Sequence, residues 1–93
     1  MPVAVLTLEI HLPYAHSLKE KRFMVRKIKD RLRARFNVAV AELDHQELWQ
    51  RAVVGVVSIS SDQQNLETVM EGVQRESEKV LGGDLVRTEL SFF

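Results

Sequence analysis

Apolar and polar residues alternate over the ten residues that follow the first two residues of the chain. Within the segment from Val3 to Leu12, every second side chain from Leu6 onward is aliphatic. A polar side chain stands between each two of these aliphatic residues. A two-residue period is typical of a strand with one buried face. The expected inward residues are Leu6, Leu8, Ile10 and Leu12, and the expected outward residues are Thr7, Glu9 and His11.

The period changes after Pro13 and Tyr14. Ser17 and Glu20 have the spacing of a capping box, in which the serine hydroxyl and the glutamate carboxylate accept hydrogen bonds from backbone N–H groups of the first turn. We therefore expect a helix that starts at Ser17 and ends near Asn37. Its apolar side follows the i, i+3, i+4, i+7 pattern of an amphipathic helix. That side consists of Leu18, Met24, Val25, Ile28, Leu32 and Phe36.

The second half of the chain repeats this plan. Residues 37–43 and 51–60 are predicted to be strands, joined as a hairpin by the polar segment 44–50. Ser61 or Asp62 is expected to cap a second helix, which Gly82-Gly83 ends, and residues 85–93 form the last strand. The apolar side of this helix consists of Leu66, Val69, Met70, Val73, Val80 and Leu81.

The order strand, helix, strand, strand, helix, strand predicts an α+β fold of the ferredoxin-like βαββαβ type. Two right-handed crossovers interleave into a four-stranded antiparallel sheet with two helices on one face. A chain of 93 residues has room for one modest core. We expect residues 1–93 to form a single ferredoxin-like domain.

The strand predicted at 51–60 carries valine on both faces. Val53, Val57 and Ile59 occupy one face and Val54 and Val56 the other, so the strand has the composition of one that is buried on both sides. The face without helices, to which Val3 and Val5 of the first strand also belong, is expected to be an apolar patch. Because helices cover only one face, the pattern favours a homodimer formed through the open sheet face. The alternative is that valine is simply preferred in strands.

Composition restricts the class of protein. The chain has no cysteine, its N-terminal residues enter a strand without a basic and apolar leader, and its apolar runs are too short to cross a bilayer. These features predict a cytoplasmic protein with no membrane contact.

The formal net charge is zero, but the charge is unevenly distributed. Nine of the 13 Lys and Arg residues lie between positions 19 and 35, together with only two acidic residues. Five of these cations follow a 3,4,3,4 spacing along one side of the first helix. We call them the basic stripe: Lys19, Arg22, Arg26, Lys29 and Arg33. Like charges at this spacing cost a few tenths of a kcal/mol per pair, so the stripe favours binding of phosphates or of an acidic protein. The alternative is a solvated face whose long side chains cover the edges of the core.

Polar residues of several loops are expected at one end of the fold, beside the N-terminus of the first helix, where an anion could bind. Lys21 falls toward the apolar side of the helix, so its ammonium should reach water or a carboxylate. Trp49 is expected to plug the open end of the core, and the alternative is a stacking platform for a ligand. No recognised metal-ligand spacing or catalytic constellation is present, so the sequence predicts no metal, no cofactor and no catalytic residue. The candidate residues at this end are His16, Ser17, Lys21, Asp44, His45, Gln46, Trp49 and Arg51.

Three segments resemble the signatures of the YlxP-like family, bacterial proteins classed as a domain of unknown function. They are residues 16–22 (HSLKEKR), 35–38 (RFNV) and 44–52 (DHQELWQRA). The resemblance implies a ferredoxin-like domain and, in many bacteria, a gene beside those for translation initiation and ribosome maturation factors. It implies no catalytic residues.

Three functions are compatible with these features. The favoured hypothesis is a non-enzymatic accessory protein that associates with structured RNA, including ribosomal RNA, through the basic stripe. The second is a protein–protein interaction module that binds an acidic partner. The third is a small phosphate-handling enzyme of acylphosphatase-like shape, which the absence of glycine and arginine from residues 13–17 disfavours.

Overall fold

The structure is a computed structural model that describes residues 2–45 and 47–93. Its elements have the predicted order, and each strand end lies within two residues of its predicted position. The elements are β1 (Val3–His11), α1 (Leu18–Arg35), β2 (Ala39–Asp44), β3 (Arg51–Ile59), α2 (Gln63–Leu81), the short 3-10 helix η1 (Gly82–Asp84) and β4 (Leu85–Phe92).

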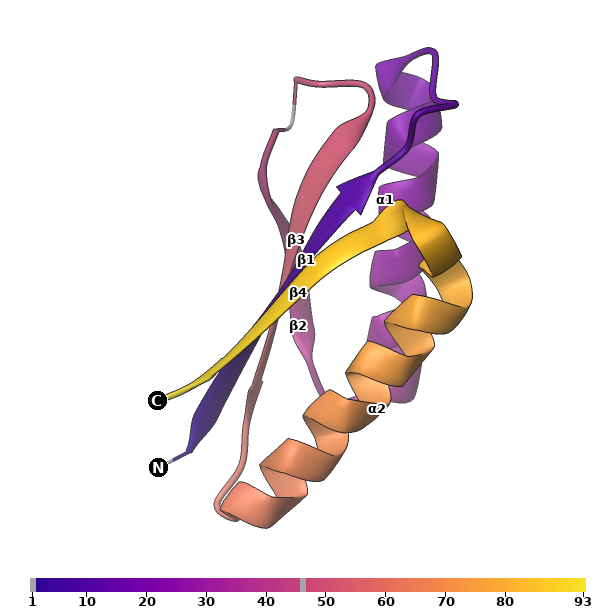
Figure 1. Cartoon of the computed structure of the whole chain (residues 1–93). Coiled ribbons are helices and arrows are strands. Elements are labelled where there is room, and N and C mark those ends of the chain that lie inside the picture. The colour runs from indigo at the N-terminus through magenta and orange to yellow at the C-terminus, as the bar shows by residue number, and fades with distance from the viewer. Residues whose placement is uncertain (1, 46) are drawn as a thin grey trace.

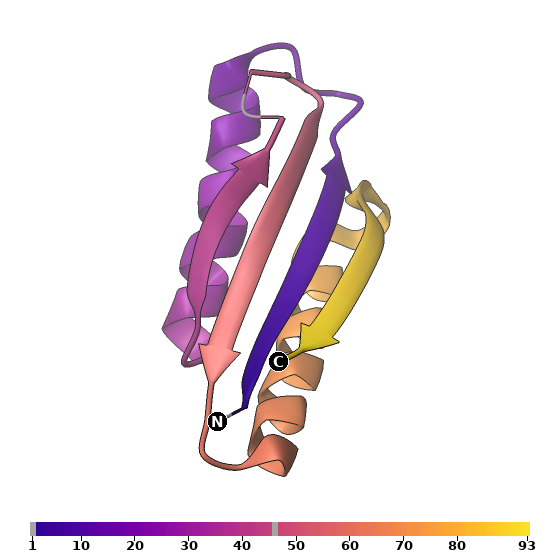
Figure 2. The same cartoon turned by 90° about the vertical axis from the view of Figure 1, so that its left-hand side faces the viewer.

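The four strands form one antiparallel sheet in the order β2-β3-β1-β4. Both helices lie on the same face of the sheet (Figure 1), and the view in Figure 2 looks onto the opposite, open face. In that view α1 lies behind β2 and α2 lies behind the other side of the sheet. This arrangement confirms the predicted ferredoxin-like α+β fold.

The core lies between the sheet and the helices. Alternate residues of β1 and β3 point toward the helices and are buried, as the two-residue period predicts. The aliphatic stripes of both helices meet them, and each fully buried Leu, Ile or Val contributes roughly 1.5–3 kcal/mol relative to exposure. The largest apolar side chains without exposed surface are Leu6, Leu8, Leu12, Ile28, Leu32, Leu66 and Met70.

The helix ends follow the predicted capping chemistry. The hydroxyl of Ser17 accepts from the backbone N–H of Glu20, and Asp62 caps α2 in the same manner through Gln64. Glu20 departs from a standard capping box because its carboxylate accepts from the N–H of His16 instead of from that of Ser17. Gly82 ends α2 at a φ of 55°, a conformation that glycine adopts without strain.

The open face of the sheet carries the apolar side chains that the sequence pattern indicated. Val54 and Val56 are buried under the helices, but Val57 and Ile59 on the other side of β3 are 38% and 53% exposed. The expectation that the second face of this strand is an open apolar patch is therefore confirmed for Val57 and Ile59. Only one face has helices to cover it, and the single chain supplies no second layer.

Candidate nucleic-acid interface

The basic stripe lies on the outer flank of α1. Arg31 and Arg35, roughly half a turn around the helix axis from the stripe at 100° per residue, face α2 and bind Glu76 there. The stripe therefore points away from α2. Figure 2 shows α1 at the edge of the helix layer, beside β2. Four of its five members are exposed, and Lys29 is half-buried.

Few carboxylates of the protein neutralise the charge of the basic stripe. Arg33 forms an ion pair with Asp30 at 3.0 Å, one turn earlier in α1. Within the described residues, no carboxylate lies within 4 Å of the charged nitrogens of the other four members, which are Lys19, Arg22, Arg26 and Lys29. This flank is therefore a row of cations open to a ligand.

Glu76 explains why the two flanks of α1 differ. Its carboxylate is almost fully buried and accepts from Arg31 at 2.9 Å and from Arg35 at 3.4 Å. Two of the nine basic residues of this region thus bind the second helix across more than 40 residues of sequence. Sequence reasoning missed Glu76, although a signal was present: this carboxylate lies between Val73 and Val80 on the apolar side of α2.

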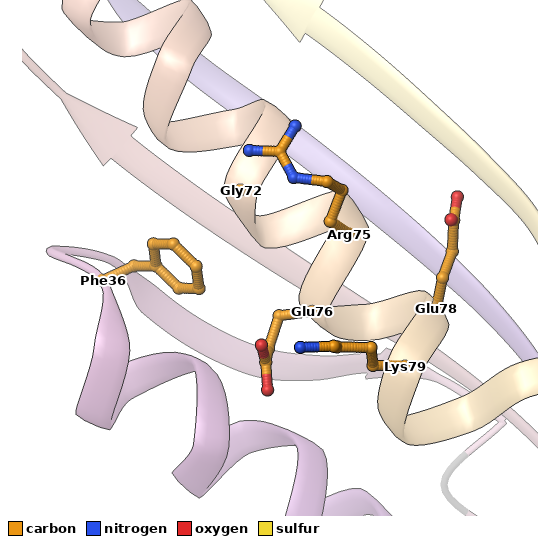
Figure 3. A pocket seen from close by; sticks show the side chains of 6 residues that line it. All are labelled: Phe36, Gly72, Arg75, Glu76, Glu78 and Lys79. Atoms are coloured by element: carbon orange, nitrogen blue, oxygen red, sulfur yellow. The ribbon is translucent and has the colours of Figure 1, made fainter.

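A hollow opens next to this carboxylate, between the C-terminal end of α1 and the middle of α2. Its volume is about 580 Å³, and it is lined by Phe36, Gly72, Arg75, Glu76, Glu78 and Lys79. Figure 3 shows the ring of Phe36 directed toward α2, where it packs close to Gly72, with charged side chains of both signs around the rim. Because the signs are mixed, the hollow adds no net attraction for an anion.

The predicted loop end is assembled in the structure. The segment 12–16 meets the end of the hairpin through Gln50, whose backbone carbonyl accepts from Leu12 and whose side chain donates to Pro13 and Ala15. The hydroxyl of Tyr14 donates to Asp84 at 2.8 Å, which ties the same segment to η1. Burial, followed by the hydrogen bond and the charge of Asp84, raises the pKa of Tyr14 above its ordinary value of 10.0.

Lys21 lies within this end of the molecule but is closed to ligands. Its side chain has no exposed surface, and its ammonium donates to the carbonyls of His45 at 2.6 Å and Arg51 at 3.3 Å. The carboxylate of Glu42 lies 3.1 Å away. The expectation that Lys21 reaches water or a carboxylate is confirmed for the carboxylate, and its role is to hold the hairpin on α1.

The N-terminus of α1 is already occupied by its own chain. Ser17 accepts from Glu20, and the carboxylate of Glu20 accepts from the N–H of His16. A phosphate at this position would meet that carboxylate, and like charges repel. The geometry therefore disfavours an anion cradle in the loop before α1.

The hairpin presents its remaining candidates to solvent. Asp44 and Arg51 are exposed, and Asp44 accepts from the N–H of His45, whose φ is 62°. Gln46 lies outside the described residues. Trp49 is 54% exposed, so the expectation that it plugs the core is wrong. Leu12 and Ala15 close that end of the core instead.

Two other kinds of site are absent from residues 2–45 and 47–93. These residues contain no group of three or more His, Asp or Glu side chains placed to hold a metal ion. None of the helices in the same ranges has both the length and the apolar character needed to cross a membrane.

Comparison with known proteins shows the family to which the chain belongs. A family model described as "Protein of unknown function (DUF503)" matches residues 3–89. The chain belongs to this family. Over 59 residues it is 37% identical to the uncharacterized protein YlxP of Bacillus subtilis strain 168, a match that covers 63% of this chain and 64% of YlxP. The resemblance found in the sequence is thereby confirmed.

Solved structures similar to this DUF503 member share its fold. The de novo designed protein Foldit4 superimposes with a TM-score of 0.58 at 15% identity, covering 99% of this chain and 94% of the design. Rv0793 from Mycobacterium tuberculosis gives 0.57 at 14% identity, covering 100% and 93% of the two chains. At such identities the likeness concerns the arrangement of strands and helices alone.

Proposed function

We propose that this DUF503 protein is a non-enzymatic protein that docks on structured RNA, with ribosomal RNA as the first RNA to test, through the basic stripe of α1. The observation that carries the proposal is the division of α1 into two flanks. One flank binds Glu76 of α2, whereas on the other flank four of the five cations have no carboxylate within 4 Å among the described residues.

The dimensions of the stripe suit a phosphate backbone. From Lys19 to Arg33 the helix rises about 21 Å, and successive stripe residues stand roughly 5 Å apart along the axis, at 1.5 Å per residue. Arg and Lys side chains are long enough to reach neighbouring phosphates from such a row. Bound phosphates would also relieve the repulsion between cations one turn apart.

The composition of the open sheet face favours α1 over the sheet as the element that contacts RNA. RNA-recognition modules of this fold stack bases on aromatic side chains of the two central strands. Here β1 and β3, the central strands, contain no aromatic residue. The stripe reads charge and shape but no base edges, which fits structured RNA better than a specific single-stranded sequence.

Filter binding across a salt series tests the proposal. The variant Arg22→Gln with Arg26→Gln removes two charges from the stripe, and Arg75→Gln with Lys79→Gln removes two exposed charges from α2. For ribosomal RNA we expect the first variant to bind about tenfold more weakly at low salt, with a salt slope smaller by roughly 2, because each phosphate contact contributes about 1 to that slope.

The α2 variant serves as the matched control and should keep the affinity and slope of the parent protein. Equal losses in both variants would indicate only a general charge effect, and an unchanged affinity in the stripe variant would refute RNA docking by this flank. If the stripe variant instead loses an acidic protein partner in a nuclease-treated pull-down while RNA binding is unchanged, the second sequence-based hypothesis replaces the first.

A further inference from the structure

The open face of the sheet carries an apolar area that the single chain leaves uncovered. Exposed and half-buried aliphatic residues of β1, β2 and β3 lie together there, from the N-terminal end of β1 to Leu43 near the hairpin. We propose that this area binds a second copy of the chain, so that the protein is a homodimer with two sheets packed face to face. The area consists of Val3, Val5, Ala39, Ala41, Leu43, Val57 and Ile59.

The pairing register places these residues on one surface. Val5 pairs with Val57, and Val57 pairs in turn with Ala39, so three adjacent strands present aliphatic side chains at the same level. Cross-strand partners in an antiparallel sheet point to the same side. Ile59 extends this surface beyond Val57, next to Val3, and is 53% exposed.

The surface has relief as well as apolar character. Leu43 stands at a register shift of β2 and lies over Gly55, where an added Cβ would come within 2.6 Å of its Cδ1. Beside it, the small side chains of Ala39 and Ala41 leave a groove of about 200 Å³, which Val5 and Val57 also line. In a two-fold interface the same surface of both copies is used and each contact occurs twice. A projecting side chain of one copy can therefore enter the groove of the other, and the reverse contact forms at the same time.

The size of the face approaches the area that each partner buries in a standard protein interface. Four strands spaced by about 4.8 Å and up to nine residues long present a plane of roughly 19 by 30 Å. Side chains that project from this plane increase its accessible area toward the 800 Å² or so that each partner buries in a standard interface. Two sheets stacked in this way lie about 10 Å apart and form an interior of interdigitated aliphatic residues.

The charges on this face favour a second copy over RNA. They lie at the end toward the hairpin and form a rim, where Arg87 is 3.6 Å from Glu9 and 3.2 Å from Glu89. Asp44 and Arg51 complete the charged residues of this rim, which holds one more carboxylate than guanidinium. An apolar centre with a polar rim is the usual anatomy of a protein interface, and a rim without excess positive charge gives no attraction for phosphates.

Docking of this face does not compete with the stripe. The helices lie on the other side of the sheet, so a face-to-face dimer keeps α1 exposed in both copies (Figure 1). Each dimer would present two stripes on opposite outer surfaces.

Analytical ultracentrifugation over a concentration series tests the dimer. The full chain should sediment with twice the monomer mass, and Val57→Glu with Ile59→Glu should raise the dimer Kd at least about thirtyfold, because each carboxylate would be buried in an apolar interface. Both side chains are more than one third exposed in the single chain, so the substitutions leave the core intact. Phe23→Glu with Ala34→Glu, at exposed positions of α1, is the matched control and should remain dimeric.

Circular dichroism and urea unfolding of each variant confirm that it is folded. A parent protein that is monomeric at all concentrations, or a folded V57E/I59E variant that dimerises as tightly as the parent, would overturn the proposal.

Discussion

Lys21 and Glu42 form an ion pair of 3.1 Å that joins α1 to β2 from the inside of the molecule. The ammonium has no exposed surface, and it also donates to the carbonyl groups of His45 and Arg51 at the two ends of the hairpin. A fully buried lysine is rare unless paired, and here every partner belongs to the β2–β3 unit. The shape of the hairpin therefore depends on a residue of the helix.

Replacement of Lys21 by methionine should lower the free energy of unfolding by about 2–4 kcal/mol. The substitution keeps an unbranched side chain of similar length but leaves the carbonyls of His45 and Arg51 without this donor and Glu42 without its cation. Urea unfolding monitored by the single tryptophan measures the effect. Lys27→Met at an exposed position of the same helix is the control, expected within about 0.5 kcal/mol of the parent. Equal stability of the two variants would contradict this role of Lys21.

Replacement of Glu76 by glutamine should weaken the contact between α1 and α2 and lower the free energy of unfolding. The change leaves two guanidinium groups facing a neutral amide at a nearly buried position, and we expect a loss of about 1–2 kcal/mol. Arg31 and Arg35 are about half exposed, so either alone should cost less when changed to glutamine. A double-mutant cycle between Glu76 and Arg31 should give a coupling energy above zero. The exposed neighbour Glu78→Gln controls for loss of charge, and a coupling of zero would count against the pair.

The effect of a Gly72 substitution on the stability of the protein should depend on the residue at position 36. A Cβ at Gly72 would lie 2.7 Å from Cε1 of Phe36, so the ring has to move. Alanine in place of glycine within a helix otherwise gains about 1 kcal/mol. We expect G72A to lose this gain in the parent protein and to recover it in a Phe36→Leu background. Thermal unfolding of the four proteins measures the difference, and an equal effect of G72A in both backgrounds would show that the contact is unimportant.

Tyr14 should make stability depend on pH in the alkaline range. Burial, the hydrogen bond to Asp84 and its charge raise the pKa of the phenol in the folded protein, so folding favours the protonated form. This contribution is complete below the ordinary pKa of 10.0 and is lost as pH rises through the folded pKa. The chain has one tyrosine, so tyrosinate absorbance during an alkaline titration reports on Tyr14 directly.

Asp84→Asn removes the charge and should move that titration toward 10.0, whereas Asp62→Asn, at the far end of α2, should not. Identical titrations of the parent and D84N proteins would contradict the assignment.

Local chemistry along the chain was enough to predict the fold. The periods of apolar residues, the capping serine and aspartate, and the glycine after Leu81 each act over a few neighbours, so the sequence indicated the order, the type and nearly the bounds of the four strands and two α-helices. It did not indicate the short 3-10 helix η1. The basic stripe was equally readable, because residues three and four apart in a helix lie on one side of it.

Tertiary structure decided which charges are available to a ligand. Arg31, Arg35 and Lys21 belong to the same basic segment as the stripe, but their carboxylate partners lie 21 to 45 positions away in the sequence. Local periods carry no information about such distant pairs. In the same way, the valine pattern marked an apolar open face, but only the assembled sheet showed that Val57 and Ile59 lie exposed on it. The sequence by itself determined the architecture and where the cations gather, and long-range packing determined which of them are paired with a distant carboxylate.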